Sequence, residues 1–258
     1  MKIWNKILFI IAWVCFSDAA ISQVTVYSVS NAHSHNDYLR VSPFYKAFEK
    51  GFGSIEADVF PVNGTLCVAH SKNEIDTQRT LQGLYLQPLV KEVSAGKMRK
   101  LNLLVDIKED HKTCLKLLIK ELEPLKAYLS TPEQENNITI IISGERPVPA
   151  VYKEYPAFIF FDNDLKTKHT PEQWRRVALV SLPFNKLSAW KGTDDLAKKD
   201  EKAVKAVIDN VHQAGKPIRF WAAPDTELSW SWQMKLKVDF IGTDKITELS
   251  DFLNKKND

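Results

Sequence analysis

Ile55-Glu56-Ala57-Asp58-Val59-Phe60 is the stretch from which the fold of this chain can be worked out. Apolar residues alternate in it with two acids, and residues i and i+2 of a β-strand point to the same face. The carboxylates of Glu56 and Asp58 therefore point the same way. Two like charges on an otherwise apolar strand are costly to bury unless a cation lies between them, and a hard divalent cation suits carboxylate oxygens.

A hairpin is predicted directly after this strand. Asn63-Gly64 is a strong two-residue turn signal, and Leu66-Cys67-Val68-Ala69-His70 follows it. We expect the second segment to fold back beside the carboxylate strand and to bring the His70 imidazole near the two acids. The alternative is an exposed edge strand with a polar outer face, since short alternating patterns are weakly specific.

Polar residues also stand at the ends of other apolar runs. The β-branched run 24–32 ends in His33-Ser34-His35. Residues 101–108 are too apolar for a one-sided sheet and are typical of a buried parallel strand, and this run ends with Asp106 and Lys108 on one face. Further along the chain, Gly144-Glu145-Arg146 and Trp221 also close apolar runs.

The spacing of these runs predicts an α/β fold, a single-domain (β/α)₈ TIM barrel. A doubly wound open sheet is the competing architecture, but no glycine-rich phosphate loop follows any of the strands. In a barrel the carboxyl ends of the strands meet at one rim, so the polar residues above would surround one site. The eight predicted strands are 25–32, 53–59, 101–107, 138–143, 158–162, 177–182, 218–222 and 238–243.

The first residues have the pattern of a secretory signal peptide. Lys2 and Lys6 precede the apolar run 7–16, and small residues suited to cleavage follow up to Ser22. The apolar run is about ten residues long, whereas a membrane span needs roughly twenty. The sequence therefore predicts a signal peptide at residues 1–22 and an exported domain at residues 23–258, in the periplasm or outside the cell.

Composition excludes several classes of protein. Hydrophobic residues make up 44% of the chain, which is enough for a sizeable core, and the net charge is only +3. Lys and Arg are scattered among acids, so nothing indicates nucleic-acid binding. Cys67 and Cys114 follow the predicted cleavage site, and we expect them to be buried free thiols because two cysteines do not make a disulfide scaffold.

Several short motifs occur in the same order as in a known family, and they extend over nearly the whole predicted mature chain. The motifs are Ala32-His33, the helix pattern Phe44-x-x-Ala47-x-x-x-Gly51, Ile55-Glu56-Ala57-Asp58-Val59, Leu66-x-Val68-Ala69-His70, Leu101-x-Leu103-x-x-Asp106-Ile107-Lys108, Arg219-Phe220-Trp221 and Val238-Asp239-Phe240-Ile241-Gly242-Thr243-Asp244. In this order they resemble the motifs of glycerophosphodiester phosphodiesterases, which belong to the wider group of phospholipase C-like phosphodiesterases with (β/α)₈ barrels.

The resemblance implies roles for particular residues. Glu56, Asp58 and Asp106 would bind a divalent cation, Mg²⁺ or Ca²⁺, and His70 would be one of two catalytic histidines. The other would be His33 or His35. The family usually has Arg after its first His and Glu as its third ligand, whereas this chain has Ser34 and Asp106, the latter as in the sphingomyelinase D branch. The headgroup specificity is therefore left open.

These observations predict an exported, metal-dependent phosphodiesterase that acts on glycerophosphodiesters or related lipid headgroups by histidine acid–base catalysis. Lys108 or Arg146 would contact the phosphate, and Trp221 would stack on the substrate. One alternative is a catalytically silent barrel that binds a phosphorylated ligand. Another is an enzyme like sphingomyelinase D or phosphatidylinositol phospholipase C that forms a cyclic phosphate. The expected partner is a small-molecule phosphodiester or a lipid headgroup, with no nucleic acid and no stable membrane insertion, and the oligomeric state is left open.

Overall fold

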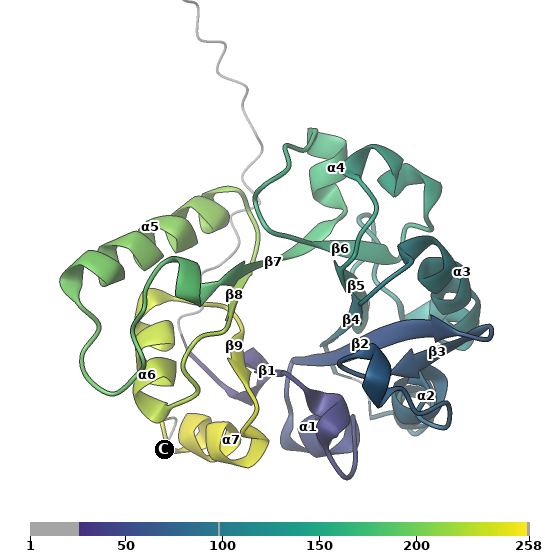
Figure 1. Cartoon of the computed structure of the whole chain (residues 1–258), viewed down its shortest axis with the longest axis horizontal. Helices are drawn as coiled ribbons and strands as arrows, with labels where there is room; N and C mark the ends of the chain where they lie inside the picture. The colour runs from purple at the N-terminus through teal and green to yellow at the C-terminus, as the bar shows by residue number, and fades with distance from the viewer. Residues whose placement is uncertain (1–25, 98, 257–258) are drawn as a thin grey trace, which may run out of the picture.

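A ring of parallel strands forms the centre of the molecule (Figure 1). The computed structural model describes residues 26–97 and 99–256, so the predicted signal peptide, residues 1–22, lies outside the described residues. Neighbouring strands follow the order β8-β7-β6-β5-β4-β2-β1-β9, and an isolated parallel bridge between Arg219 and Phe240 joins the two ends into a nearly closed barrel. The strands are β1 (Ala32–Ser34), β2 (Ser54–Val62), β4 (Leu101–Ile107), β5 (Ile138–Gly144), β6 (Ile159–Asn163), β7 (Val177–Pro183), β8 (Ile218–Trp221) and β9 (Ile241–Thr243).

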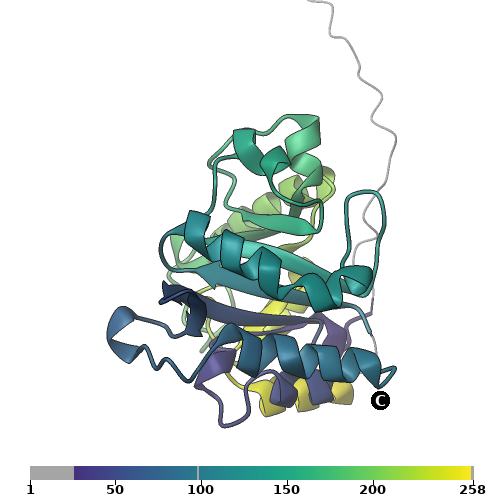
Figure 2. The ribbon, with the colours of Figure 1, turned by 90° about the vertical axis from the view of Figure 1, so that its right-hand side faces the viewer.

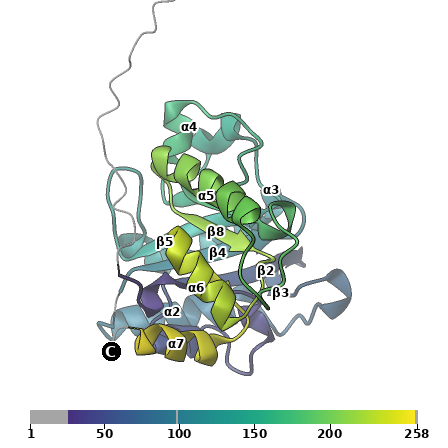
Figure 3. The same cartoon turned by 90° about the vertical axis from the view of Figure 1, so that its left-hand side faces the viewer.

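Helices surround this ring, so the predicted (β/α)₈ barrel is confirmed. Turned views show α2 and α3 covering one side of the barrel and α5 and α6 covering the opposite side (Figures 2 and 3). No helix within the described part of the chain combines the length and the apolar character needed to cross a bilayer. The α-helices are α1 (Tyr45–Lys50), α2 (Gln87–Ser94), α3 (His111–Glu121), α4 (Pro171–Arg175), α5 (Lys198–Gln213), α6 (Glu227–Leu236) and α7 (Ile246–Lys255). A π-helical turn at Gln82–Leu86 precedes α2, and short 3₁₀ helices occupy Val29–Asn31, Asp37–Leu39, Lys72–Glu74, Glu123–Tyr128, Pro149–Glu154 and Phe184–Lys186.

Successive side chains of each strand point alternately outward and inward. The outer face is apolar, whereas the inner face is apolar deep in the barrel and polar at its carboxyl end. Leu103 and Val105 point outward into the main core. Leu104, from the inner face, packs with Ile141 and Leu179 in a separate small cluster. Two residues further along β4, on the same face, comes Asp106, so an apolar plug lies beneath a polar layer at the carboxyl end of the barrel.

The predicted hairpin is confirmed. Asn63 and Gly64 both have positive φ, 49° and 82°, as a tight hairpin turn requires. β3 (Thr65–Val68) pairs antiparallel with β2, outside the ring. The backbone N–H of Ala69 then donates to the Asp58 carbonyl at 3.2 Å, which holds the next residue, His70, close to the carboxylate strand.

The start of the chain differs from the prediction in two places. The strand expected at 25–32 lies at 32–34, because the side chains of Ser28 and Asn31 bond nearby backbone and close a 3₁₀ turn over Val29–Asn31. Ser42-Pro43 has the pattern that opens a helix, with Ser at the N-cap and Pro at the first helical position, but α1 begins at Tyr45. Phe44 adopts φ 65° and ψ −61°, a strained γ-turn in which the Tyr45 N–H donates to the Pro43 carbonyl at 2.8 Å.

Candidate active site

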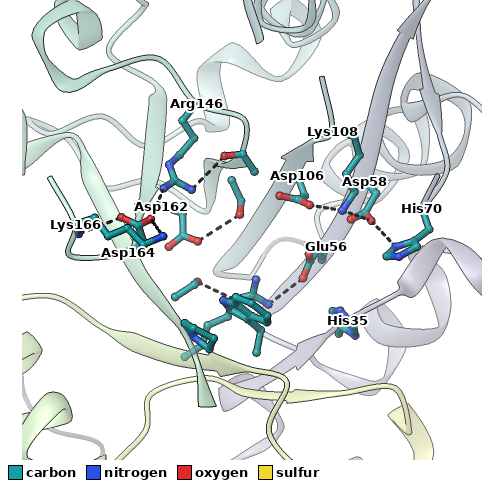
Figure 4. Close-up of a pocket in the computed structure, with 16 residues that line it drawn as sticks. His35, Glu56, Asp58, His70, Asp106, Lys108, Arg146, Asp162, Asp164 and Lys166 are labelled. Atoms are coloured by element: carbon teal, nitrogen blue, oxygen red, sulfur yellow. Dashed lines mark hydrogen bonds and ion pairs between the residues drawn. The ribbon is translucent and has the colours of Figure 1, made fainter. Parts of the chain in front are cut away.

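A cavity of about 460 Å³ opens at the carboxyl ends of the strands (Figure 4). Eight of the nine residues that the sequence predicts for the site line this cavity, although they come from six different strands or strand ends. The exception is His33, which lies beneath it. The eight lining residues are His35, Glu56, Asp58, His70, Asp106, Lys108, Arg146 and Trp221.

Three carboxylates come together on one wall of the cavity. Asp58 and Asp106 are paired across β2 and β4, and one carboxylate oxygen each of Glu56, Asp58 and Asp106 lies within 4.8 Å of the others. Lys108 contacts both aspartates, with Nζ 2.6 Å from Asp58 Oδ2. On the other side of the group, Arg219 Nη1 donates to Glu56 Oε2 at 2.9 Å.

The donor set fits a hard divalent cation. Among the described residues, two fixed cations, Lys108 and Arg219, pair with the three carboxylates, which leaves one net negative charge in a largely buried site. Burial and the nearby charge of Glu56 raise the pKa of Asp58 even though Lys108 is bound to it. Further positive charge would therefore stabilise this group, and oxygen donors are those that Mg²⁺ and Ca²⁺ prefer. The buried acidic triad could bind such an ion.

His33 is a buried support for Glu56. Its side chain has no solvent exposure, Nδ1 lies 2.7 Å from Ser54 Oγ, and Nε2 lies 2.8 Å from Glu56 Oε2. Burial and the charge of Arg219 lower the pKa of His33 to about 4, so the ring is neutral at pH 7. Both ring nitrogens are therefore engaged below the cavity.

His35, two residues further along the same inner face, does line the cavity. Its Nδ1 lies 2.8 Å from Asp244 Oδ1, on the loop after β9. Burial acts to lower the pKa of His35, but the hydrogen bond to Asp244 and the charge of Glu56 outweigh it, and the pKa is raised above its ordinary value. His35 is thus held ready to carry a proton at near-neutral pH.

His70 lies at the other side of the triad, with 61% of its side chain exposed. Nδ1 lies 3.3 Å from Asp58 Oδ2 and 3.2 Å from the Tyr38 hydroxyl, and the same hydroxyl donates to Asp58 Oδ2 at 2.8 Å. An ionised carboxylate only accepts hydrogen bonds, so Nδ1 of His70 carries the proton that faces Asp58. The Nε2 lone pair is then free to accept a proton.

The wall across the cavity carries charges of both signs (Figure 4). Arg146 Nη2 and Lys166 Nζ lie 3.8 and 3.0 Å from Asp164 Oδ2, so two cations share one carboxylate. Asp162 lies deeper, and burial raises its pKa to about 6. Trp221, with 45% of its surface exposed, stands at the edge of the opening.

Sequence reasoning gave no role to several residues of this site, among them Tyr38, Asp162 and Arg219. Arg219 was part of a quoted motif, but only its neighbour Trp221 received a role. A charged residue between Ile218 and Phe220, both buried, was the available signal. Such a residue must find a partner inside the barrel, because an unpaired buried charge is too costly.

Comparisons with known proteins find relatives in sequence and in fold. Residues 22–98 match the model of the AIM6-like phosphodiesterase domain. The chain is 27% identical to the altered inheritance of mitochondria protein 6 homolog of Arthroderma benhamiae, over 80% of this chain and 74% of the relative. It is 28% identical to altered inheritance of mitochondria protein 6 of Lachancea thermotolerans, over 92% of this chain and 69% of the relative.

Two solved structures share the fold. A glycerophosphodiester phosphodiesterase from Parabacteroides distasonis matches with a TM-score of 0.53 and 13% identity, over 90% of this chain and 97% of the other. One from Agrobacterium tumefaciens matches with a TM-score of 0.52 and 13% identity, over 86% and 99%. The resemblance predicted from the motifs is therefore confirmed: the chain is similar to the AIM6-like phosphodiesterases in sequence and to the glycerophosphodiester phosphodiesterases in fold.

Proposed function

We propose that this protein is a metal-dependent phosphodiesterase that hydrolyses glycerophosphodiesters or related lipid-headgroup phosphodiesters. The observation that carries the proposal is the buried acidic triad next to two histidines, each of which has one ring nitrogen held by a carboxylate, in a single cavity. Because residues 1–22 have the pattern of a signal peptide, we also propose that the enzyme is exported.

The charges in the cavity suit a phosphodiester, which carries one negative charge. Glu56, Asp58 and Asp106 would hold a divalent cation, which would supply positive charge to stabilise the phosphate. With that ion the group has one net positive charge instead of one net negative charge. Lys108 and Arg219, which both line the cavity, add N–H donors on the same wall.

The two histidines divide the proton transfers. His70, with Nδ1 held at Asp58, presents Nε2 as the base that takes a proton from the attacking water. His35, kept protonated by Asp244, is the acid that gives a proton to the leaving alkoxide. This role falls to His35 because it faces the cavity, whereas both ring nitrogens of His33 are engaged beneath it.

Asp244→Asn is expected to move the alkaline limb of the pH–kcat/KM profile to lower pH. The carboxylate helps to raise the pKa of His35, so the wild-type acid stays protonated above its ordinary pKa of about 6.5. Without that charge His35 loses its proton at lower pH, and activity falls earlier as the pH rises. An unchanged alkaline limb in this variant would remove His35 from the role of acid.

Tyr38→Phe is expected to lower kcat by about 10-fold with little change in metal affinity. The variant loses only the hydroxyl that joins Asp58 to His70, so the carboxylate keeps Lys108 while the imidazole loses one of its two contacts. Steady-state kinetics at saturating metal would measure the effect. A lower metal affinity with normal kcat would instead show that the hydroxyl serves the ligand Asp58.

Phosphorus NMR tests the proposed activity directly. The purified protein would be incubated with glycerophosphodiesters and lysophospholipids in the presence of Mg²⁺, Ca²⁺ or chelator. We expect new phosphomonoester signals that vanish with chelator. Cyclic-phosphate signals would instead assign the chain to the cyclising enzymes, and no turnover by folded, metal-loaded protein would favour the catalytically silent binding barrel.

A further inference from the structure

Exposed apolar side chains are concentrated at the end of the barrel onto which the cavity opens. Seven large apolar residues are exposed in the described part of the chain, and five of them lie at or shortly after the carboxyl ends of strands, with Trp221 lining the cavity itself. Single exposed apolar residues are ordinary, but five of seven at one end of the barrel form a concentration. These five residues, called the rim below, are Leu39, Val41, Val148, Leu165 and Trp221.

The two remaining exposed apolar residues lie at the opposite end of the barrel. Val26 precedes β1 and Tyr128 precedes β5, so both stand on the side from which the parallel strands begin. Val26 is 73% exposed, comparable with Leu39 at 67% and Val148 at 64%. Val26 is therefore a matched control for the rim.

The rim segment that carries Leu39 and Val41 is anchored by hydrogen bonds at both of its ends. Asp37 is fully buried, and its carboxylate accepts hydrogen bonds from Ser34 Oγ at 2.8 Å and from the Phe44 N–H at 2.6 Å. Between these two anchors the loop carries Leu39 and a fully exposed Val41. The fold thus fixes both ends of this segment and leaves its apolar tip in water.

Cations stand next to the apolar residues of the rim. Arg40 separates Leu39 from Val41, and Lys166 follows Leu165 directly. Arg146 is two residues before Val148 and shares the single carboxylate of Asp164 with Lys166, which leaves a net positive charge there. Apolar side chains flanked by cations match a phospholipid surface, because the former enter the boundary of the acyl chains while the latter contact phosphates.

We propose that the rim docks on the surface of a phospholipid bilayer, so that the cavity opens onto the lipid headgroups. The rim comes from four different strand ends on the face onto which the cavity opens, which suits a broad, deformable surface. Trp221 fits this position because indole rings are favoured at the boundary between lipid and water. Vesicle binding does not depend on turnover, whereas the consequence for substrate choice rests on the proposed function.

Vesicle sedimentation tests the docking. Vesicles of phosphatidylcholine with phosphatidylserine would be mixed with wild-type protein and with V41D, V148D and V26D. Removing one exposed valine that would enter the bilayer and adding a charge is expected to weaken binding about tenfold or more for V41D and V148D, but not for V26D. All four proteins carry the same residues 1–25, so any contribution from the apolar run at 7–16 cancels.

A dye at position 41 gives an independent readout. Val41→Cys labelled with an environment-sensitive fluorophore is expected to shift to the blue on vesicles, and labelled Val26→Cys is not; Cys67 and Cys114 are buried and do not compete for label. Equal binding by all variants without a shift at position 41 would overturn the proposal. So would a rim buried in a homodimer, seen as a V41D-sensitive dimer by light scattering.

Turnover separates the docking from the proposed function. V41D and V148D are expected to hydrolyse a soluble glycerophosphodiester like the wild type and to lose activity only toward the same headgroup in vesicles. Vesicle binding without any turnover would leave the rim intact and reject the phosphodiesterase. Turnover of the soluble substrate by a protein that binds no vesicles would support the phosphodiesterase and reject the docking of the rim.

Discussion

His70→Asn is expected to lower kcat by about 10²–10⁴-fold while leaving the fold and metal binding intact. Asparagine can still donate a hydrogen bond to Asp58, so the carboxylate keeps its surroundings. It has no nitrogen lone pair of suitable basicity to take a proton from water. The loss should therefore appear in kcat at saturating metal, with a calorimetric metal titration close to that of the wild type.

His111 offers a matched control for this substitution. Its imidazole also pairs with a carboxylate, with Nδ1 2.9 Å from Glu145 Oε1, but it does not line the cavity. His111→Asn should thus leave kcat nearly unchanged. If His70→Asn retained more than about a tenth of wild-type kcat, the base would have to be sought elsewhere, because positioned acid–base groups are worth more than that.

Asp106→Asn is expected to weaken binding of Mg²⁺ or Ca²⁺ by at least about 100-fold, since losing even an outer partner of a ligand costs 10–100-fold. The substitution removes one of the three charges that would hold the ion. It leaves Lys108 bound to Asp58, so no buried charge is stranded and the melting temperature in chelator should change little. Isothermal calorimetry would measure the affinity, and activity against metal concentration would show the same shift.

Asp110→Asn is the control for that experiment. The Asp110 side chain accepts from the Thr113 N–H at the start of α3, and asparagine caps helices equally well. Asp110→Asn changes the net charge by the same amount as Asp106→Asn, but outside the cavity. It should therefore leave the metal affinity at the wild-type value. Wild-type affinity in Asp106→Asn as well would exclude Asp106 as a ligand.

The central strands could be predicted because their patterns are local. Alternation placed Glu56 and Asp58 on one face, the continuous apolar run identified β4, and Asn63-Gly64 fixed the hairpin that brings His70 to the acids. Barrel geometry then converted strand ends into a single site without any knowledge of distances. These inferences needed only neighbours along the chain.

The depth of a residue inside the barrel could not be predicted from local sequence patterns. His33 and His35 share a face, and only the register decides which one reaches the cavity. His33 is level with Ser54 of β2 and Gly242 of β9, one layer below the opening. The position of β1 itself was also missed, since short polar side chains closed a 3₁₀ turn where β-branched residues suggested a strand.

Arg219 and Tyr38 illustrate the same difficulty at longer range. Arg219 meets Glu56 across 163 residues of sequence, and no local pattern announces that pair. Tyr38 reaches Asp58 from a single 3₁₀ turn, which is too short to show a period in the sequence. Such contacts exist only after the barrel has formed, so they become visible in the structure and not in the sequence.

The site is therefore complete only when the last forty residues of the chain are in place. β8 and β9 meet through a single bridge, and they bring Arg219 to Glu56 and Asp244 to His35. A nascent chain that has not yet reached residue 219 holds its acids without the guanidinium that neutralises Glu56. Closure of the barrel and assembly of the charged site thus depend on the same residues, so we expect a polypeptide released early to lack a complete site.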